Sequence, residues 1–140
     1  MMLNKYATAL LALSACFAFD CKAYDHSEEY RRCISVPNLS ESMEYNCIKE
    51  ENMALLRKAD TLKQQIQNTG LFSELVAKGL TLDKQMADWQ TYITSFCEYS
   101  KESACAYDKS PQILKEECLY NFMATLVEDW ENLLKSAQKR

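Results

Sequence analysis

Cysteine is the residue type with the greatest capacity for chemistry in this sequence. The chain of 140 residues contains seven cysteines, an odd number and a high density for this length. Such a set indicates a disulfide framework, a metal site, or a framework plus one cysteine that the mature protein does not use. The seven are Cys16, Cys21, Cys33, Cys47, Cys97, Cys105 and Cys118.

A metal site or a cysteine nucleophile fits the sequence poorly. No Cys-x2-Cys pair occurs, and His26 is the only histidine, so the usual zinc patterns fail. A catalytic Cys–His pair is disfavoured for the same reason. We therefore expect no metal and no cofactor. His26 lies in a polar segment, where a single histidine is most often solvated.

Carboxylates are the second candidate for chemistry. They occur as adjacent pairs, and neighbours on a helix point about 100° apart, so a pair does not converge on one substrate. A glycosidase needs two carboxylates that face each other across a cleft. No phosphate loop, HExxH or GxSxG motif is present. We expect that the protein is not an enzyme. The pairs are Glu28-Glu29, Glu50-Glu51 and Glu116-Glu117.

The N-terminal segment has the pattern of a secretory signal peptide. Lys5 provides a short positive region, and the uncharged run from residue 7 to residue 19 is too short to span a bilayer. We expect residues 1–18 to be removed. The alternative is a lipoprotein signal of residues 1–15, because Leu13-Ser14-Ala15-Cys16 matches a lipobox and would leave Cys16 lipidated. Either route leaves six cysteines, which predicts three disulfides in an oxidising compartment.

These features predict a periplasmic or secreted protein, or one with a lipid anchor at the cell envelope. No second apolar stretch approaches about 20 residues, so we expect no membrane span. Without Lys5 the chain has 15 basic and 20 acidic residues, a net charge of −5. No basic patch stands out, which disfavours nucleic acid as a partner. An acidic surface would attract a basic protein.

Glycine and proline are scarce, with two of each, and this excludes collagen-like, Gly-rich disordered and turn-dense β architectures. Segment 21–37 is polar and predicts a loop with a short helix. A long helix is predicted over residues 38–68, with Asn38 and Glu41 as a capping box and Gly70 as its stop. Its apolar face is Ile48, Leu55, Ala59, Leu62 and Ile66, and its solvent face is Glu51, Lys58 and Gln65.

Two further helical segments follow. Residues 71–99 predict a helix with a break at Gly79 and a restart capped by Thr81. Ser110-Pro111 predicts the start of a last helix that runs to about residue 137. We therefore expect an all-α fold, a small antiparallel helical bundle stapled by disulfides, as one domain over residues 19–140. The predicted core positions of the first segment are Leu82, Met86, Trp89, Ile93 and Phe96. The predicted apolar side of the last helix is Leu119, Met123 or Leu126, Trp130, Leu133 and Ala137.

Four elements of the sequence form a recognisable pattern: Phe19-Asp20-Cys21 with Cys33, then Pro37-Asn38-Leu39-Ser40, Trp89 with Tyr92 and Cys97, and Cys118-Leu119. In these elements the chain resembles, as a divergent member, the lysozyme inhibitor LprI-like N-terminal domain family. Met86 and Ala87 stand where the family has Gln-Arg, and Ile93-Thr94 stands where it has Arg-Asp. Cys47 and Cys105 are additional. The resemblance covers most of residues 19–134.

Six cysteines allow fifteen connectivities. By spacing, we expect Cys21–Cys33 and Cys97–Cys118, with Cys47–Cys105 as the remaining pair.

The resemblance implies an exported binding protein that inhibits lysozyme-type cell-wall hydrolases by stoichiometric binding. The expected partner is a protein, such as a basic lysozyme-type hydrolase, and contact with a membrane is expected only if Cys16 is lipidated. The alternative is a periplasmic immunity protein against a delivered toxin, or an envelope assembly subunit. Candidate contact segments are residues 25–32 and 98–110. The partner-binding candidates in the second segment are Tyr99, Glu102, Tyr107 and Asp108.

Overall fold

The computed structural model describes residues 25–103 and 109–139, and within these ranges it is all-α. The all-α prediction is therefore confirmed. The three long helices are α3 (Glu41–Asn68), α5 (Leu82–Glu98) and α6 (Pro111–Gln138). Three short elements accompany them: α2 (Glu28–Ile34), α4 (Ser73–Ala77) and the 3-10 helix η2 (Tyr99–Ser103).

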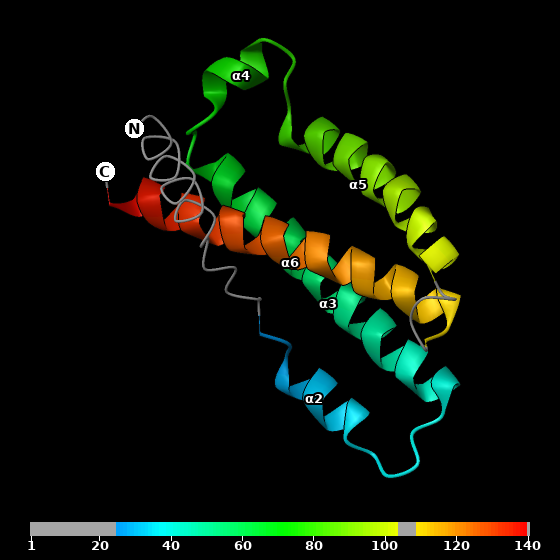
Figure 1. The fold of residues 1–140 in the computed structure, drawn as a ribbon. Helices are drawn as coiled ribbons and strands as arrows, with labels where there is room; N and C mark the ends of the chain where they lie inside the picture. The colour runs from blue at the N-terminus through cyan, green and yellow to red at the C-terminus, as the bar shows by residue number, and fades with distance from the viewer. Residues whose placement is uncertain (1–24, 104–108, 140) are drawn as a thin grey trace, which may run out of the picture.

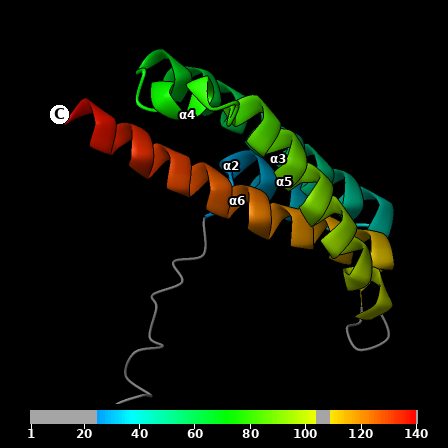
Figure 2. The same ribbon diagram turned by 90° about the horizontal axis from the view of Figure 1, so that it is seen from above.

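The long helices run up, down and up, so that helices consecutive along the chain are antiparallel (Figure 1). As a result α3 and α6 are parallel to each other, and they pack along much of their length. Helix α5 lies on one side of this pair, and α2 lies against α3 (Figure 2). The short α4 stands at the end of the bundle, between α3 and α5.

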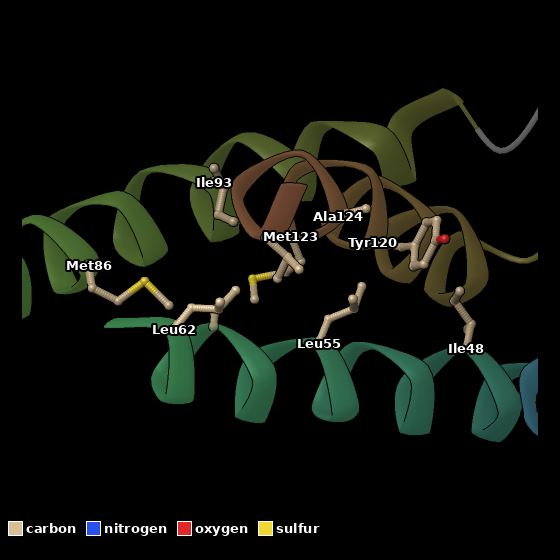
Figure 3. Close-up of a cluster of buried hydrophobic side chains, with 10 residues drawn as sticks. Ile48, Leu55, Leu62, Met86, Ile93, Tyr120, Met123 and Ala124 are labelled. Carbon is tan, nitrogen blue, oxygen red and sulfur yellow. The ribbon is translucent and has the colours of Figure 1, made fainter. Parts of the chain in front are cut away.

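The hydrophobic core lies where α3, α5 and α6 meet (Figure 3). All five apolar positions predicted for α3 are buried, at 7% exposure or less. On α6, Met123 of the predicted apolar side is buried, and Leu119, Leu126 and Trp130 are half-buried and pack against the core. Leu133 and Ala137 are half-buried. The other buried side chains of α6 are Ile113, Leu114, Tyr120, Ala124 and Val127.

The starts of the long helices follow hydroxyl caps. Thr81 caps α5 and Ser110 caps α6, with Pro111 in the first turn, as predicted. The predicted Asn38 cap of α3 is wrong, since Ser40 Oγ accepts the hydrogen bond from Met43 N. Asn38 instead has a φ of +56°, a left-handed conformation that asparagine tolerates in a turn.

The segment after α3 forms a short helix and then a long one, with non-helical residues between them. Gly70 has a φ of +67° and follows the end of α3, as predicted for a helix stop. Gly79 has a φ of +79°. The break expected at this residue separates the five-residue helix α4 from α5. Residues 71–72 and 78–81 lie outside both helices.

Three predicted side-chain environments are wrong. Glu51, expected on the solvent face of α3, is 5% exposed because Ser27 docks onto its carboxylate. Phe96, expected in the core, is 47% exposed, and Cys97 occupies the buried position beside it. His26, expected in solvent, is stacked between the rings of Tyr30 and Tyr120.

Two disulfides lie within the described residues. Cys97–Cys118 joins the end of α5 to α6, as predicted, with a Cα–Cα distance of 5.6 Å. The second bond is Cys33–Cys47, with a Cα–Cα distance of 5.8 Å. The predicted pairs Cys21–Cys33 and Cys47–Cys105 are therefore wrong. The turn at residues 35–40 reverses the chain, and this places the last turn of α2 beside the second turn of α3. Cys16, Cys21 and Cys105 lie outside the described residues.

None of the helices in the described part of the chain combines the length and apolar character needed to cross a membrane.

Candidate protein-binding surface

Two of the four predicted partner-binding residues can be placed. Tyr99 and Glu102 belong to η2, which continues directly from α5, and both are exposed. Tyr99 is 75% exposed, the largest value among the exposed large apolar and aromatic side chains of the described residues. Tyr107 and Asp108 lie outside the described residues.

Tyr99 belongs to a row of exposed aromatic side chains. Tyr92, Phe96 and Tyr99 are spaced four and three residues apart, which puts them on one face of α5 and its continuation. We call these three residues the aromatic row. Tyr92 is 65% exposed, and its ring stacks on that of Phe96 at 6.3 Å between centroids. Aromatic side chains of this kind are enriched at protein interfaces, because they carry a large contact area at low entropic cost.

The rest of α5 holds the aromatic row in place. Met86, Ile93 and Cys97 are buried on the adjoining side of the helix, which faces the core. The Cys97–Cys118 disulfide fixes the end of α5 to α6, close to the row. Phe96 also contacts Phe122 of α6 edge-on, with 5.5 Å between ring centroids. A partner would thus meet a surface that is already ordered, which lowers the entropic cost of binding.

Ion pairs reinforce the same junction. The carboxylate of Glu98 pairs with Lys101, at 2.6 Å, and with Lys115 of α6. Hydrogen bonds from Lys101 and Lys115 lower the pKa of Glu98 below its ordinary value. Glu102 makes no ion pair with any residue of the described ranges, so its charge is directed to solvent or to a partner.

The adjacent carboxylates have diverging environments. Glu51 is buried while Glu50 is exposed. Glu116 accepts a hydrogen bond from Asn52 of α3 at 2.7 Å, and Glu117 pairs with Lys109. Glu51, Glu116 and Glu117 therefore bond to three different residues, Ser27, Asn52 and Lys109. Among the described residues, no group of three or more His, Cys, Asp or Glu side chains could hold a metal ion.

Sequence reasoning identified Tyr99 but missed Tyr92 and assigned Phe96 to the core. The spacing of Leu82, Met86, Trp89, Ile93 and Phe96 is regular, but the buried seam passes through Cys97. A cysteine is among the most buried residue types and behaves as a small apolar side chain. Met86 and Ile93 belong to both the predicted and the buried seam, and taking Cys97 in place of Phe96 as the last core position puts Phe96 at the edge of the seam beside Tyr92.

Comparisons of the chain with family models, with curated proteins and with solved structures gave no significant match. The resemblance to the lysozyme inhibitor LprI-like N-terminal domain family therefore stays a prediction from the residues alone.

Proposed function

We propose that the chain is an exported binding protein that inhibits a basic, lysozyme-type cell-wall hydrolase by forming a stoichiometric complex through the aromatic row. The observation that carries the proposal is the exposed, disulfide-anchored row Tyr92, Phe96 and Tyr99. Export is supported by the two disulfides, since such bonds persist in oxidising compartments.

Charge supports a basic partner. The full sequence has a net charge of −4, and Glu102 lies three residues beyond Tyr99 without an ion-pair partner in the described ranges. Opposite net charges raise the rate of encounter, and this contribution weakens as salt screens it. The aromatic rings would then supply the short-range contacts, including cation–π contacts with lysine or arginine side chains of the partner.

The direct test mixes the oxidised protein, without residues 1–18, with a basic lysozyme at low salt and follows lysis of bacterial cell walls. The protein at molar excess should slow lysis, and added salt should weaken the effect. A Tyr92→Ala, Tyr99→Ala double variant should bind at least about tenfold more weakly, as expected when interface anchors are truncated. Val76→Ala is the matched control, because Val76 is 50% exposed on α4, outside the row.

Unchanged lysis at high molar excess and low salt would refute the inhibitor proposal. Inhibition that the double variant and the Val76 control retain equally would place the contact surface elsewhere on the molecule. Affinity capture with the same oxidised protein distinguishes the alternative. Stoichiometric recovery of a delivered toxin or an envelope protein, in place of a hydrolase, would identify an immunity protein or an assembly subunit.

A further inference from the structure

His26 lies in an aromatic sandwich at the point where the N-terminal segment meets the bundle. Its ring stacks on Tyr30 of α2 at 4.1 Å and on Tyr120 of α6 at 4.0 Å between centroids. The interplanar angles are 22° and 17°, so both faces of the imidazole are covered. The two tyrosine faces present negative quadrupole to the imidazole, which favours a cationic ring between them.

One nitrogen of this ring has an anion beside it. His26 Nδ1 is buried and makes no hydrogen bond, and it lies 3.6 Å from Glu51 Oε1 on α3. Glu51 already accepts hydrogen bonds from Ser27 N, at 2.8 Å, and from Ser27 Oγ, at 2.5 Å. A carboxylate oxygen can accept a further bond, so a proton bound at His26 would have an acceptor within a small shift of the ring.

The charged groups around the sandwich are mostly negative. The pKa of the Tyr30 phenol is raised, first by burial and then by the carboxylates of Glu117 and Glu44, with a smaller contribution from Glu51. Lys109 acts in the opposite direction, but its ammonium is hydrogen-bonded to Glu117. A groove of about 370 Å³ between α2 and α3 also borders the site, and its charged lining residues are Glu29, Glu50, Glu51 and Arg57.

We propose that His26 is a pH-sensitive latch, whose protonation fastens the N-terminal segment, residues 25–34, onto α3 and α6. The imidazolium gains an ion pair with Glu51 and cation–π contacts with Tyr30 and Tyr120. At neutral pH, where an imidazole has generally lost its proton, these gains are absent and only the ring stacking remains.

The segment that the latch holds has few other attachments. Helix α2 contains no buried residue, although Tyr30 packs against the core, and one end of the helix is tied by the Cys33–Cys47 disulfide. The other end is held by His26 and by Ser27, which also caps the helix. Loosening the latch would free the N-terminal end of α2, while the disulfide retains its C-terminal end. This movement would open the groove between α2 and α3.

The experiment measures the equilibrium constant for unfolding in urea at pH 5.5 and pH 7.5, for the oxidised protein and for His26→Phe. Phenylalanine keeps a ring in the sandwich and removes the titrating group. We expect the unfolding constant of the wild-type protein to be about threefold to fivefold smaller at pH 5.5 than at pH 7.5, as for an ion pair that is partly open to solvent. This ratio should return close to one in His26→Phe. Glu51→Gln, which keeps an acceptor for Ser27, should show the same loss of pH dependence.

A second readout locates the effect. Because His26 is the only histidine of the chain, a single imidazole signal in a proton NMR titration belongs to it without assignment. Amide exchange in residues 28–34, corrected for intrinsic rates, should slow at pH 5.5 in the wild-type protein alone. An equal pH ratio in wild type and His26→Phe, or a wild-type protein that unfolds more readily at pH 5.5 than at pH 7.5 while the variant does not, would overturn the proposal.

Discussion

Ser27 Oγ donates a hydrogen bond of 2.5 Å to the buried carboxylate of Glu51, 24 residues further along the chain. The same hydroxyl accepts a hydrogen bond from Tyr30 N, so Ser27 both caps α2 and attaches it to α3. A buried carboxylate that loses a donor incurs the cost of its unreplaced solvation. This single side chain therefore links the local stability of α2 to the packing of the bundle.

Ser27→Ala should lower the free energy of unfolding by about 2 kcal/mol, from the lost cap and the lost bond to a charged acceptor. Urea denaturation at pH 7 provides the measurement. Ser40→Ala is the matched control, because Ser40 caps α3 from an exposed position and its hydroxyl accepts a hydrogen bond from Met43 N with no link to another helix. The control should lose about 1 kcal/mol. Equal losses in the two variants would show that the bond to Glu51 contributes nothing.

The Cys97–Cys118 disulfide closes a segment of 21 residues between α5 and α6. Replacing both cysteines by alanine should lower the free energy of unfolding by about 3 kcal/mol, mainly because the unfolded chain regains entropy. Peptide mapping without reductant should first recover Cys33 joined to Cys47 and Cys97 joined to Cys118. Recovery of Cys33 joined to Cys21 would contradict the structure.

The helices of this fold could largely be predicted from sequence, because periodicity and hydroxyl caps are local signals. Ile48, Leu55, Ala59, Leu62 and Ile66 follow helical spacing, and all are buried. Glu51 also falls in this seam, three residues after Ile48 and four before Leu55. Its charge suggested solvent, since its partner Ser27 belongs to a segment whose position only the tertiary fold defines.

The candidate site was less predictable for a related reason. Tyr99 was identified from its residue type in the candidate contact segment 98–110. Tyr92 and Phe96 depend on how far α5 is rotated about its axis, and that rotation is set by Cys97 pairing with Cys118 on another helix. The pairing of Cys33 likewise depends on the turn at Asn38 bringing α2 back along α3.

Acid should weaken the contact between α3 and α5. Lys63 Nζ lies 2.8 Å from Asp83 Oδ1, and its hydrogen bond lowers the pKa of Asp83. A carboxyl whose pKa is lower in the folded state stabilises the fold above its unfolded pKa, and this contribution is lost as the pH falls through the folded pKa. Lys63→Met should therefore reduce the loss of stability between pH 5 and pH 2.5 in urea titrations.

Lys78→Met serves as the control for that experiment, since Lys78 forms no ion pair within the described ranges. The control should keep the acid dependence of the wild-type protein. An acid dependence that Lys63→Met leaves intact would contradict the assignment to Asp83 and indicate other carboxylates, such as Glu98, whose pKa is also lowered.

Alkali should loosen the N-terminal segment through Tyr30. Burial raises the pKa of its phenol above the ordinary value of 10.0, and nearby carboxylates add to the rise. A group with a raised pKa stabilises the fold below its unfolded pKa, and the contribution is lost as the pH rises through the folded pKa. Stability should therefore fall as the pH rises above 10, and Tyr30→Phe should fall less steeply. The absorbance of tyrosinate near 295 nm should show a late-titrating phenol in the wild-type protein that is missing from the variant. If the two titrations coincide, Tyr30 ionises as a solvated tyrosine and its stacking on His26 leaves it open to water.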